Sequence, residues 1–337
     1  MTGGYEAVRG RGVAAFVRET GRDTYWRALA EQRASYVGPD GLARSELLED
    51  VTCAACSSGD ARTAFRKDGF RYVRCLGCGS IYISPQLRDE QLDAYWADSP
   101  VAALWLDVLV APAQLEFDRA KYHDALERLE RLRGGPGSLL DIGCSLGVFL
   151  DVARSRGWEV AGVEPGATAR ARAEAEFGLS VHANLSEVGE RRFDVVTFWE
   201  VVEHVKRPIE LLEAARAVLA SGGVVLTLVG GNVHSLANRV MRAASAAFDF
   251  SRLWYFSPSS YATLLGRAGL AQVDFRSVLA EIDTTVNFLR YDDPYDPVFS
   301  EPVLPPDLLA LLERTVLEGD LGYKFLSVAR DAEGERP

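Results

Sequence analysis

The sequence predicts an α/β protein with a seven-stranded, mainly parallel sheet and helices on both faces, preceded by a helical segment and a small cysteine-rich unit. Two patterns predict this fold class. After residue 134, short apolar runs alternate with helical stretches, as they do in parallel sheets covered by helices. Before it, four of the five cysteines fall into two closely spaced pairs.

Composition and spacing divide the chain into four consecutive parts. Leu126, Leu129 and Leu132 recur at a helical spacing, and "GGPG" at 134–137 ends that helix. The expected parts are an N-terminal helical segment (1–50), a cysteine-rich zinc-ribbon domain (51–85), a helical linker or cap (86–133) and a sheet domain (134–331).

The sheet domain contains seven apolar runs of strand length. We expect helices in the first four gaps between them, which makes most of the sheet parallel. The runs are residues 138–142, 158–163, 179–182, 193–198, 224–229, 272–278 and 323–329.

The bulk composition narrows the function classes. The chain has 337 residues and a net charge of −11, whereas a nucleic-acid surface needs clustered Lys and Arg. No stretch has the roughly 18 apolar residues that a membrane helix needs. The first residues, "MTGGYEAVRGRG", lack the apolar core of a signal peptide. We therefore expect a cytoplasmic protein that binds neither membranes nor nucleic acids.

The cysteine pairs have the spacing of a zinc site. Cys53 and Cys56 form one C-x-x-C knuckle, and Cys75 and Cys78 form another after 18 intervening residues, with Gly79 suited to a tight turn. Four thiolates complete a tetrahedral Zn²⁺ site and leave no open position, so the zinc would be structural. Unligated thiols and a redox C-x-x-C motif are the alternatives.

The stretch "LDIGCSLG", residues 140–147, leads from a strand into a glycine loop. The Lys and Ser/Thr of a triphosphate loop do not follow it, and its spacing is not G-x-G-x-x-G. Asp141 ends the first strand, where a carboxylate would repel a pyrophosphate but suits an ammonium. Glu164 ends the next strand, where an acid can accept both ribose hydroxyls. A ligand with a ribose and an amino-acid head is S-adenosylmethionine.

Three longer stretches resemble successive motifs of class I S-adenosylmethionine-dependent methyltransferases. They are "LLDIGCSLGVFLDVARSRGWEVAGVEP", "FDVVTFWEVVEHVKRPIELLEAARAVLASGGVVLTLV" and "WYFSPSSYATLLGRAGL". The resemblance covers roughly residues 118–280 plus the last strand, and it implies a Rossmann-like fold. Many members from sugar, polysaccharide or natural-product pathways also carry a zinc ribbon ending like "RCLGCGSIYISP". This sequence has Ser145 where a glycine is commoner, and Arg252 where a His often precedes "LWYFS".

The resemblance also implies a cofactor cradle. Asp141, Gly143 and Gly147 would surround the methionine and the ribose, and Glu164 would hold the ribose hydroxyls. The other cradle residues would be Pro165 beside the adenine, Asn184 and Leu185 at its edge and face, and Trp199 and Glu200 below the methionine and the acceptor pocket. A turn residue at Asn184 and core packing of Trp199 are the alternatives.

Glu200, His204 and His234 are the candidate catalytic residues on the acceptor side. A base is needed only if the acceptor must lose a proton. In "EVVEHV", His204 can act as a base or acceptor contact, order the loop, or bind a divalent cation with Glu200 and Glu203. Similar stretches bind a cation in some ubiquinone-pathway O-methyltransferases. His234 lies in a segment at about 230–257 that suits a lid over a small acceptor, with a plain connector as the alternative.

These features predict an enzyme that transfers a methyl group from S-adenosylmethionine to a small-molecule acceptor by in-line displacement at O, N or C. Sugars and natural-product intermediates are the candidate acceptors. One alternative is an RNA or protein methyltransferase whose ribbon docks the polymer, and another is a non-catalytic binding protein that keeps the fold. The sequence leaves the acceptor and the oligomeric state open.

Overall fold

A single seven-stranded sheet forms the centre of the molecule. The computed structural model describes residues 13–290 and 304–333, and the predicted α/β class is confirmed. The strand order is β12-β13-β10-β9-β6-β7-β8, and β13 runs antiparallel to both of its neighbours. The strands are β6 (Ser138–Ile142), β7 (Glu159–Val163), β8 (Val181–His182), β9 (Phe193–Trp199), β10 (Leu219–Val229), β12 (Leu270–Val278) and β13 (Lys324–Asp331).

The path of the chain places a switch point between β6 and β9. From β6 the chain moves outward to β7 and β8, then returns so that β9 pairs with the other side of β6. Open α/β sheets bind ligands at the carboxyl ends of strands where the order reverses in this way. The topology therefore places a ligand site at the ends of β6 and β9.

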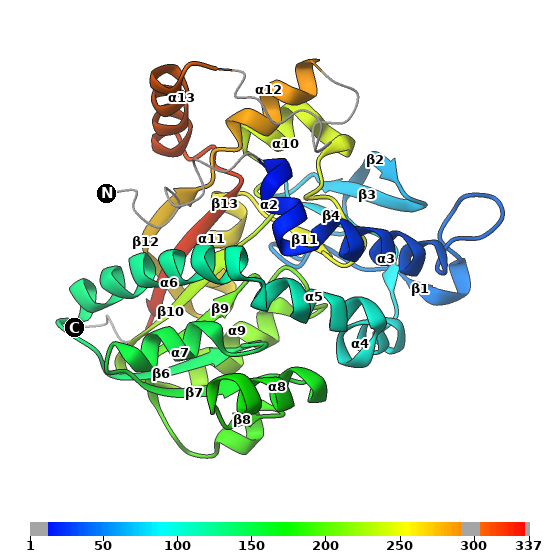
Figure 1. Cartoon of the computed structure of the whole chain (residues 1–337). Helices are drawn as coiled ribbons and strands as arrows, with labels where there is room; N and C mark the ends of the chain where they lie inside the picture. Colours follow the sequence, from blue (N-terminus) through cyan, green and yellow to red (C-terminus); the bar gives the residue numbers. More distant parts are fainter. Residues whose placement is uncertain (1–12, 291–303, 334–337) are drawn as a thin grey trace.

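Helices cover both faces of the sheet, because successive strand residues point to opposite sides. Leu139 and Val195 pack with α6, α7 and α8, whereas Leu140 and Val196 pack with α9 and α11. Figure 1 shows α6 and α7 in front of the sheet. These helices are α6 (Pro112–Arg133), α7 (Val148–Ser155), α8 (Ala167–Phe177), α9 (Pro208–Ala217) and α11 (Pro258–Arg267).

One gap between the predicted strands differs from expectation. The gaps after β6, β7 and β9 hold helices, but the gap between β8 and β9 holds only the 3₁₀ turn Leu185–Val188. The predicted helix there is wrong, because Gly189 has a φ of 69° and ends the turn after one winding. The linker helix ends as predicted at Arg133, where Gly134 adopts a left-handed φ of 87°.

The remaining helices come from two parts of the chain: α2 to α5 precede α6, and α10, α12 and α13 follow β10. Figure 1 shows α2 and α3 crossing near α5 and the ribbon strands. These helices are α2 (Val13–Thr20), α3 (Arg22–Ala34), α4 (Asp89–Asp98), α5 (Pro100–Val110), α10 (Leu236–Met241), α12 (Ile282–Arg290) and α13 (Pro306–Glu318).

The cysteine-rich part shares a sheet with the domain that follows it. β2 (Ala61–Lys67), β3 (Phe70–Cys75) and β4 (Ile81–Ile83) form an antiparallel sheet, and β11 (Trp254–Tyr255) extends it by pairing with β4. A further pair, β1 (Leu48–Glu49) and β5 (Gln86–Leu87), flanks it in sequence. The segment predicted as a lid thus supplies a strand to the ribbon, while the lid role and the domain boundaries stay predictions.

In residues 13–290 and 304–333, no single helix is both long and apolar enough to cross a bilayer. The helices Pro100–Val110 and Pro112–Arg133 have the required length and composition only together, as a pair bent by 73°. The first twelve residues, on which the expectation of a cytoplasmic protein partly rests, lie outside the described residues.

Candidate functional site

A cavity of about 1330 Å³ lies at the carboxyl ends of β6, β7 and β9. Ligand pockets usually measure about 300–1,000 Å³, so this one has room for two ligands. Its strand half consists of the loops after β6, β7 and β8 together with Trp199. Its helical half includes side chains from α2–α6, from residues 246–252 and 276–284, and from the start of β13. The predicted site residues that line the cavity are Asp141, Gly143, Glu164, Pro165, Leu185, Trp199, Glu200 and His204.

The glycine loop owes its shape to left-handed backbone conformations. Gly143 and Gly147 have φ values of 75° and 77°. A Cβ on Gly143 would lie 2.6 Å from Val201 Cγ2, and one on Gly147 would overlap Leu179 Cδ1. Ser145 has a φ of 50°, so the serine adopts the conformation that a glycine would take more easily. Gly147 shapes the loop from behind and does not line the cavity.

Two acidic side chains fix the polar character of the strand half. Asp141 is buried, and Thr197 Oγ1 donates a 2.7 Å hydrogen bond to its Oδ1. Burial raises the pKa of Asp141 to about 8. The carboxylate of Glu164 accepts hydrogen bonds from the backbone N–H groups of Ser145 (3.0 Å) and Gly166 (2.8 Å). These bonds hold the Glu164 carboxylate in place and leave lone pairs that can accept hydroxyl groups.

Trp199 lies at the border between the two halves. Its ring packs against Tyr122 and Phe149, with centroid distances of 4.7 and 4.8 Å. Its Nε1 is buried and has no hydrogen-bond partner among the described residues. An indole N–H is only a donor, so this atom is free to donate to a ligand.

Asn184 points away from the cavity. Its side chain is exposed, and its Nδ2 donates a 2.7 Å hydrogen bond to Glu187 Oε1. The structure therefore gives no contact in favour of the predicted role at the adenine edge and agrees with the turn-residue alternative, whereas Leu185 does line the cavity.

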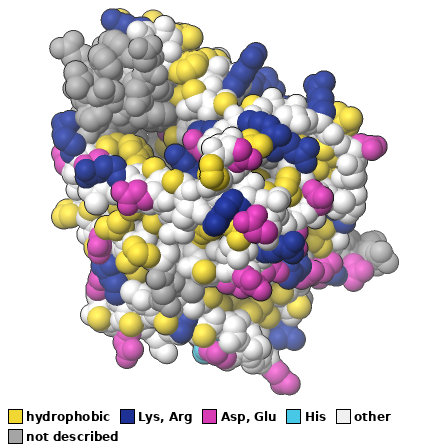
Figure 2. Space-filling view, turned by 90° about the vertical axis from the view of Figure 1, so that its right-hand side faces the viewer, with side chains coloured by type: hydrophobic (Ala, Val, Ile, Leu, Met, Phe, Trp, Pro, Cys, Tyr) yellow, Lys and Arg dark blue, Asp and Glu magenta, His cyan; other side chains and the backbone are white. Residues whose placement is uncertain are grey.

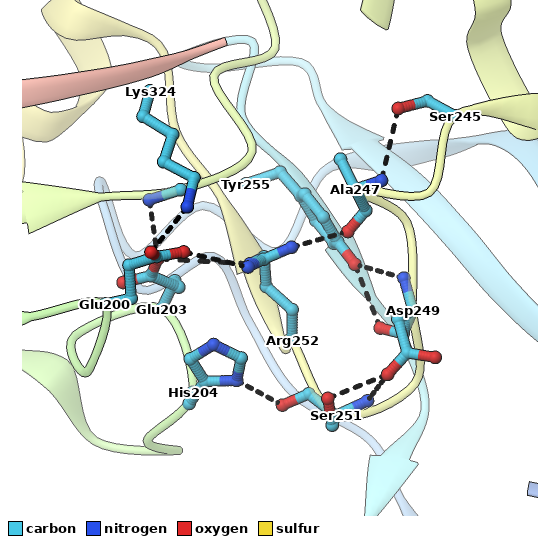
Figure 3. A network of polar contacts seen from close by, with 11 residues as sticks. Glu200, Glu203, His204, Ser245, Ala247, Asp249, Ser251, Arg252, Tyr255 and Lys324 are labelled. Atoms are coloured by element: carbon cyan, nitrogen blue, oxygen red, sulfur yellow. Dashed lines mark hydrogen bonds and ion pairs between the residues drawn. The ribbon is translucent and has the colours of Figure 1, made fainter. Parts of the chain in front are cut away.

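Glu200 belongs to a network of opposite charges (Figure 3). Lys324 Nζ donates to its Oε1 at 2.5 Å, and Arg252 Nη2 lies 3.5 Å from its Oε2. Burial alone would raise the pKa of Glu200, but Lys324 and Arg252 hold it at about 2, so the side chain is a carboxylate. Glu200 has a φ of 57°, a strained conformation that points to a site held in place by its surroundings.

Glu203 lies behind Glu200, with no exposed surface. Its Oε1 accepts a 2.6 Å hydrogen bond from the backbone N–H of Gly230. Burial raises its pKa to about 7, although Arg252 opposes this change. Within the described residues, the only group of three or more His, Cys, Asp or Glu side chains placed to hold a metal is the cysteine cluster. The geometry therefore gives no support to the alternative of a cation bound by Glu200, Glu203 and His204, since Lys324 and Arg252 balance the carboxylates.

His204 holds two loops together. Its Nδ1 lies 2.8 Å from the carbonyl oxygen of Ser251, to which it donates (Figure 3). Its ring packs edge-on against Trp96, with 5.1 Å between the ring centroids. Burial and the charge of Arg252 lower the pKa of His204 to about 3. The ring is therefore neutral near pH 7 and carries its lone pair on Nε2.

His234 lies outside the residues that line the cavity. Its backbone N–H donates to Asn232 Oδ1 at 2.9 Å, and the charges of Arg239 and Arg74 act on its ring. His234 precedes α10 and does not line the cavity, so its predicted catalytic role has no support from the geometry.

Sequence analysis did not single out three cationic side chains of the helical half: Arg22, Lys121 and Lys324. Each lies on an element that only the tertiary fold brings to the cavity. Arg252 could be noticed in the sequence, because it stands where a histidine often precedes "LWYFS" in the related motif.

The four cysteines of the ribbon form a compact cluster. Their sulfur atoms all lie within 4.8 Å of one another, with 3.5 Å between Cys53 and Cys78 and between Cys56 and Cys75. A tetrahedral site with Zn–S bonds of about 2.3 Å would separate its sulfurs by roughly 3.8 Å. The donor set and its spacing therefore fit Zn²⁺.

Comparisons with known proteins agree with this geometry. A family model described as "Methyltransferase domain" matches residues 115–274. The ubiquinone biosynthesis O-methyltransferase of Cereibacter sphaeroides is 32% identical over 212 residues, which cover 55% of this chain and 81% of that protein. The enzyme of the same name from Ruegeria pomeroyi is 35% identical over 154 residues, covering 40% and 60%. A solved SAM-dependent methyltransferase from Archaeoglobus fulgidus is 17% identical, with a TM-score of 0.44 and coverage of 64% and 93%.

The switch-point cavity, the glycine loop and the two strand-end acids define a nucleoside-binding α/β enzyme with a Rossmann-like sheet. Together with the matched family model and the relatives, they identify the family. The chain belongs to the S-adenosylmethionine-dependent methyltransferases.

Proposed function

We propose that this methyltransferase acts on a small molecule bound in the helical half of the cavity while the cofactor occupies the strand half. The observation that carries the proposal is the single cavity of about 1330 Å³, which joins the glycine loop to walls of aromatic side chains. Mostly apolar, concave sites with a few polar groups bind small molecules. The names of the relatives favour oxygen as the methylated atom. Sugars and natural-product intermediates remain candidate acceptors.

In this proposal the residues of the strand half hold the cofactor. Glu164 accepts the ribose hydroxyls, and Asp141 faces the ammonium of the methionine. The glycine loop follows a backbone path that a Cβ on Gly143 or Gly147 would disturb, because it would collide with Val201 or Leu179. When bound, S-adenosylmethionine supplies a methyl group on a sulfonium, which an acceptor atom can displace in line. The protein then has to orient the acceptor and exclude water.

The loop after β9 completes the acceptor side. The neutral Nε2 of His204 can accept a hydroxyl proton by hydrogen bonding, although a pKa of about 3 makes it a weak base. The Nδ1 bond to Ser251 fixes this loop against residues 246–252. We therefore assign His204 to ordering the loop, and Glu200 with Lys324 to holding the polar floor of the pocket.

A polymer substrate docked on the ribbon has less support. Figure 2 views the side on which the ribbon strands and α3 lie in Figure 1, and its Lys and Arg side chains are interspersed with Asp and Glu. Nucleic-acid surfaces instead gather positive charge. In addition, β4 of the ribbon pairs with β11, which directly follows the cavity-lining residues 246–252. The ribbon therefore supports this part of the cavity.

The test supplies S-adenosylmethionine with a tritiated methyl group to three separate cell fractions: low-molecular-mass metabolites, RNA and protein. We expect label only in the metabolite fraction, and less label with the Glu164→Ala variant when the cofactor is below saturation. Label in RNA or protein would contradict the small-molecule proposal. Wild-type protein that binds S-adenosylhomocysteine but labels no fraction would favour a non-catalytic binding protein.

For the ribbon we propose one structural Zn²⁺ per chain, held by Cys53, Cys56, Cys75 and Cys78. Cys75→Ser should lose the metal and lower the melting temperature, because one ligand of the tetrahedral set is gone. The matched control is Cys144→Ser, since Cys144 is a free buried cysteine outside the cluster. Elemental analysis of reduced protein should find zinc in the control and the wild type. Absence of zinc from the wild type would contradict the proposal.

A further inference from the structure

The helical half of the cavity contains a half-buried arginine that has no carboxylate partner among the described residues. Arg22, the first residue of α3, lines the cavity and lies between two aromatic rings. Its guanidinium carbon is 4.9 Å from the ring centroid of Phe16 and 5.5 Å from that of Trp105. Among the described residues, its one hydrogen bond joins Nη1 to Thr20 Oγ1 at 2.9 Å. A guanidinium has five N–H donors, so most of this donor capacity is unused.

The two nearest acidic groups are already occupied. The charges of Asp118 and Glu200 act on Arg22. Asp118 receives Lys121 Nζ at 2.5 Å on one oxygen and Gln114 Nε2 at 2.6 Å on the other. Glu200 is bound by Lys324 and Arg252. Both carboxylates are thus bound by other side chains, and neither forms an ion pair with Arg22. Burial lowers the pKa of its guanidinium, although the charges of Asp118 and Glu200 oppose this change.

The position of Arg22 in its helix is also unfavourable for stability. A positive side chain in the first turn opposes the helix dipole, which favours anions there. The preceding Thr20 uses its hydroxyl proton on the carbonyl of Phe16 and so presents an oxygen to Arg22. This bond fixes the guanidinium over the aromatic rings. Such an unfavourable, well-held cation is expected where a ligand supplies the missing negative charge.

Two further N–H donors lie nearby, of which Lys121 already binds Asp118. Lys121 Nζ is 4.4 Å from the ring centroid of Tyr122 and 5.7 Å from that of Trp199, whose buried Nε1 has no partner. Lys121 and Arg22 are connected through Phe117 and Phe16, whose rings are 5.9 Å apart. This side of the cavity thus offers N–H donors over aromatic surfaces, and an oxyanion would satisfy them.

We propose that Arg22 is a specificity-determining residue that binds a carboxylate or phosphate group of the methyl acceptor. The inference rests on the proposed function, since it assumes that the acceptor lies in the helical half. It adds a substrate class: the acceptor carries an anionic group, and its body lies against Phe16 and Trp105.

Benzoate and phenyl phosphate are suitable probes, with phenol as the neutral control. Each is titrated by calorimetry into the full-length protein, both with and without S-adenosylhomocysteine. We expect at least one of the two anions to bind the wild type about tenfold more tightly than phenol. Arg22→Met should weaken that anion about ten- to hundredfold, and Arg22→Lys should restore part of the affinity. Arg27→Met is the matched control, because Arg27 lies on the same helix with an exposed side chain.

The two anions separate a carboxylate from a phosphate. Equal binding of phenol and both anions to the wild type would overturn the inference, as would unchanged anion binding by Arg22→Met. It would also be overturned if Arg22→Met weakened S-adenosylhomocysteine but not 5′-methylthioadenosine, because the anion would then be the cofactor's carboxylate. Wild-type protein that fails to bind S-adenosylhomocysteine would contradict the proposed function, while the titrations without it still decide the role of Arg22.

Discussion

The two halves of the cavity are built in different ways. In the strand half, the backbone conformation determines the shape of the site. Glu164 is held by backbone N–H groups 2 and 19 residues away. In the helical half, charged side chains from remote segments meet, so that Lys324 reaches Glu200 across 124 residues. His204 and Ser251 are 47 residues apart. The first half depends on local sequence, whereas the second depends on how whole elements pack.

This difference explains how the halves can vary independently. The glycine loop and the strand-end acids sit at the switch point that the sheet itself creates. The helical half uses α2–α6 and residues 246–252, none of which the sheet requires. A change of acceptor can therefore arise from substitutions in the helical half that leave the cofactor half intact.

We expect the largest change in stability from a substitution in the glycine loop. Gly147→Ala should lower the free energy of unfolding by about 2–5 kcal/mol, because it combines a left-handed φ with overlap onto Leu179. It should also reduce binding of S-adenosylhomocysteine. Gly178→Ala is the control, since Gly178 has a φ of 61° with no neighbour within 4 Å of an added Cβ. Gly178→Ala should lower the free energy of unfolding by only about 1–2 kcal/mol. Urea unfolding that gives equal losses would show that the loop is not tightly packed.

Glu164→Ala tests the strand half directly. It removes a charge-assisted contact to the ribose, so the Kd for S-adenosylhomocysteine should rise about ten- to hundredfold by calorimetry. Asn184→Ala is a useful comparison, because the exposed Asn184 side chain bonds only to its own turn. It should change the Kd by less than about threefold. Unchanged affinity for Glu164→Ala would mean that the cofactor lies elsewhere.

The pKa of Asp141 predicts a pH dependence of cofactor binding. Burial raises the pKa of Asp141 to about 8, and a cationic ammonium beside it would favour the charged carboxylate. Affinity for S-adenosylhomocysteine should therefore rise about tenfold or more from about pH 6 to about pH 7.5, with proton release. Calorimetry in buffers of different ionisation enthalpy measures that proton. Asp141→Asn should bind with a flat pH profile, and a flat profile in the wild type would contradict this reading.

The smallest expected effect concerns His204. If His204 orders the loop, His204→Ala should lower both the melting temperature and the cofactor affinity. The lost hydrogen bond should reduce the free energy of unfolding by about 0.5–1.5 kcal/mol. Its lowered native pKa means that this stabilisation is complete above about pH 6.5 and is lost as the pH falls toward 3. His182→Ala on β8 is the control. Intact stability and affinity with a turnover reduced about 10²–10⁴-fold would instead make His204 a base.

The strand half was largely predictable from sequence. Asp141 and Glu164 end apolar runs, and the glycines mark the turn between strand and helix, so local patterns sufficed. The helical half was not. Arg22 lies in a helix with no motif, and Lys324 follows a strand-breaking loop. The pairing of β11 with β4 could not be anticipated either, because a two-residue strand has no periodic signal. Asn184 and His234 were placed by family motif and loop position, and neither faces the cavity.

A crystal structure of the complex with S-adenosylhomocysteine tests the central claim most directly. The account predicts that the ribose hydroxyls lie within hydrogen-bond distance of Glu164 and that the amino-acid end lies near Asp141 and Gly143. The space beside Arg22, Phe16 and Trp105 should remain available for the acceptor. A ligand whose adenosine occupies the helical half, or one that lies outside the cavity, would contradict the division into two halves.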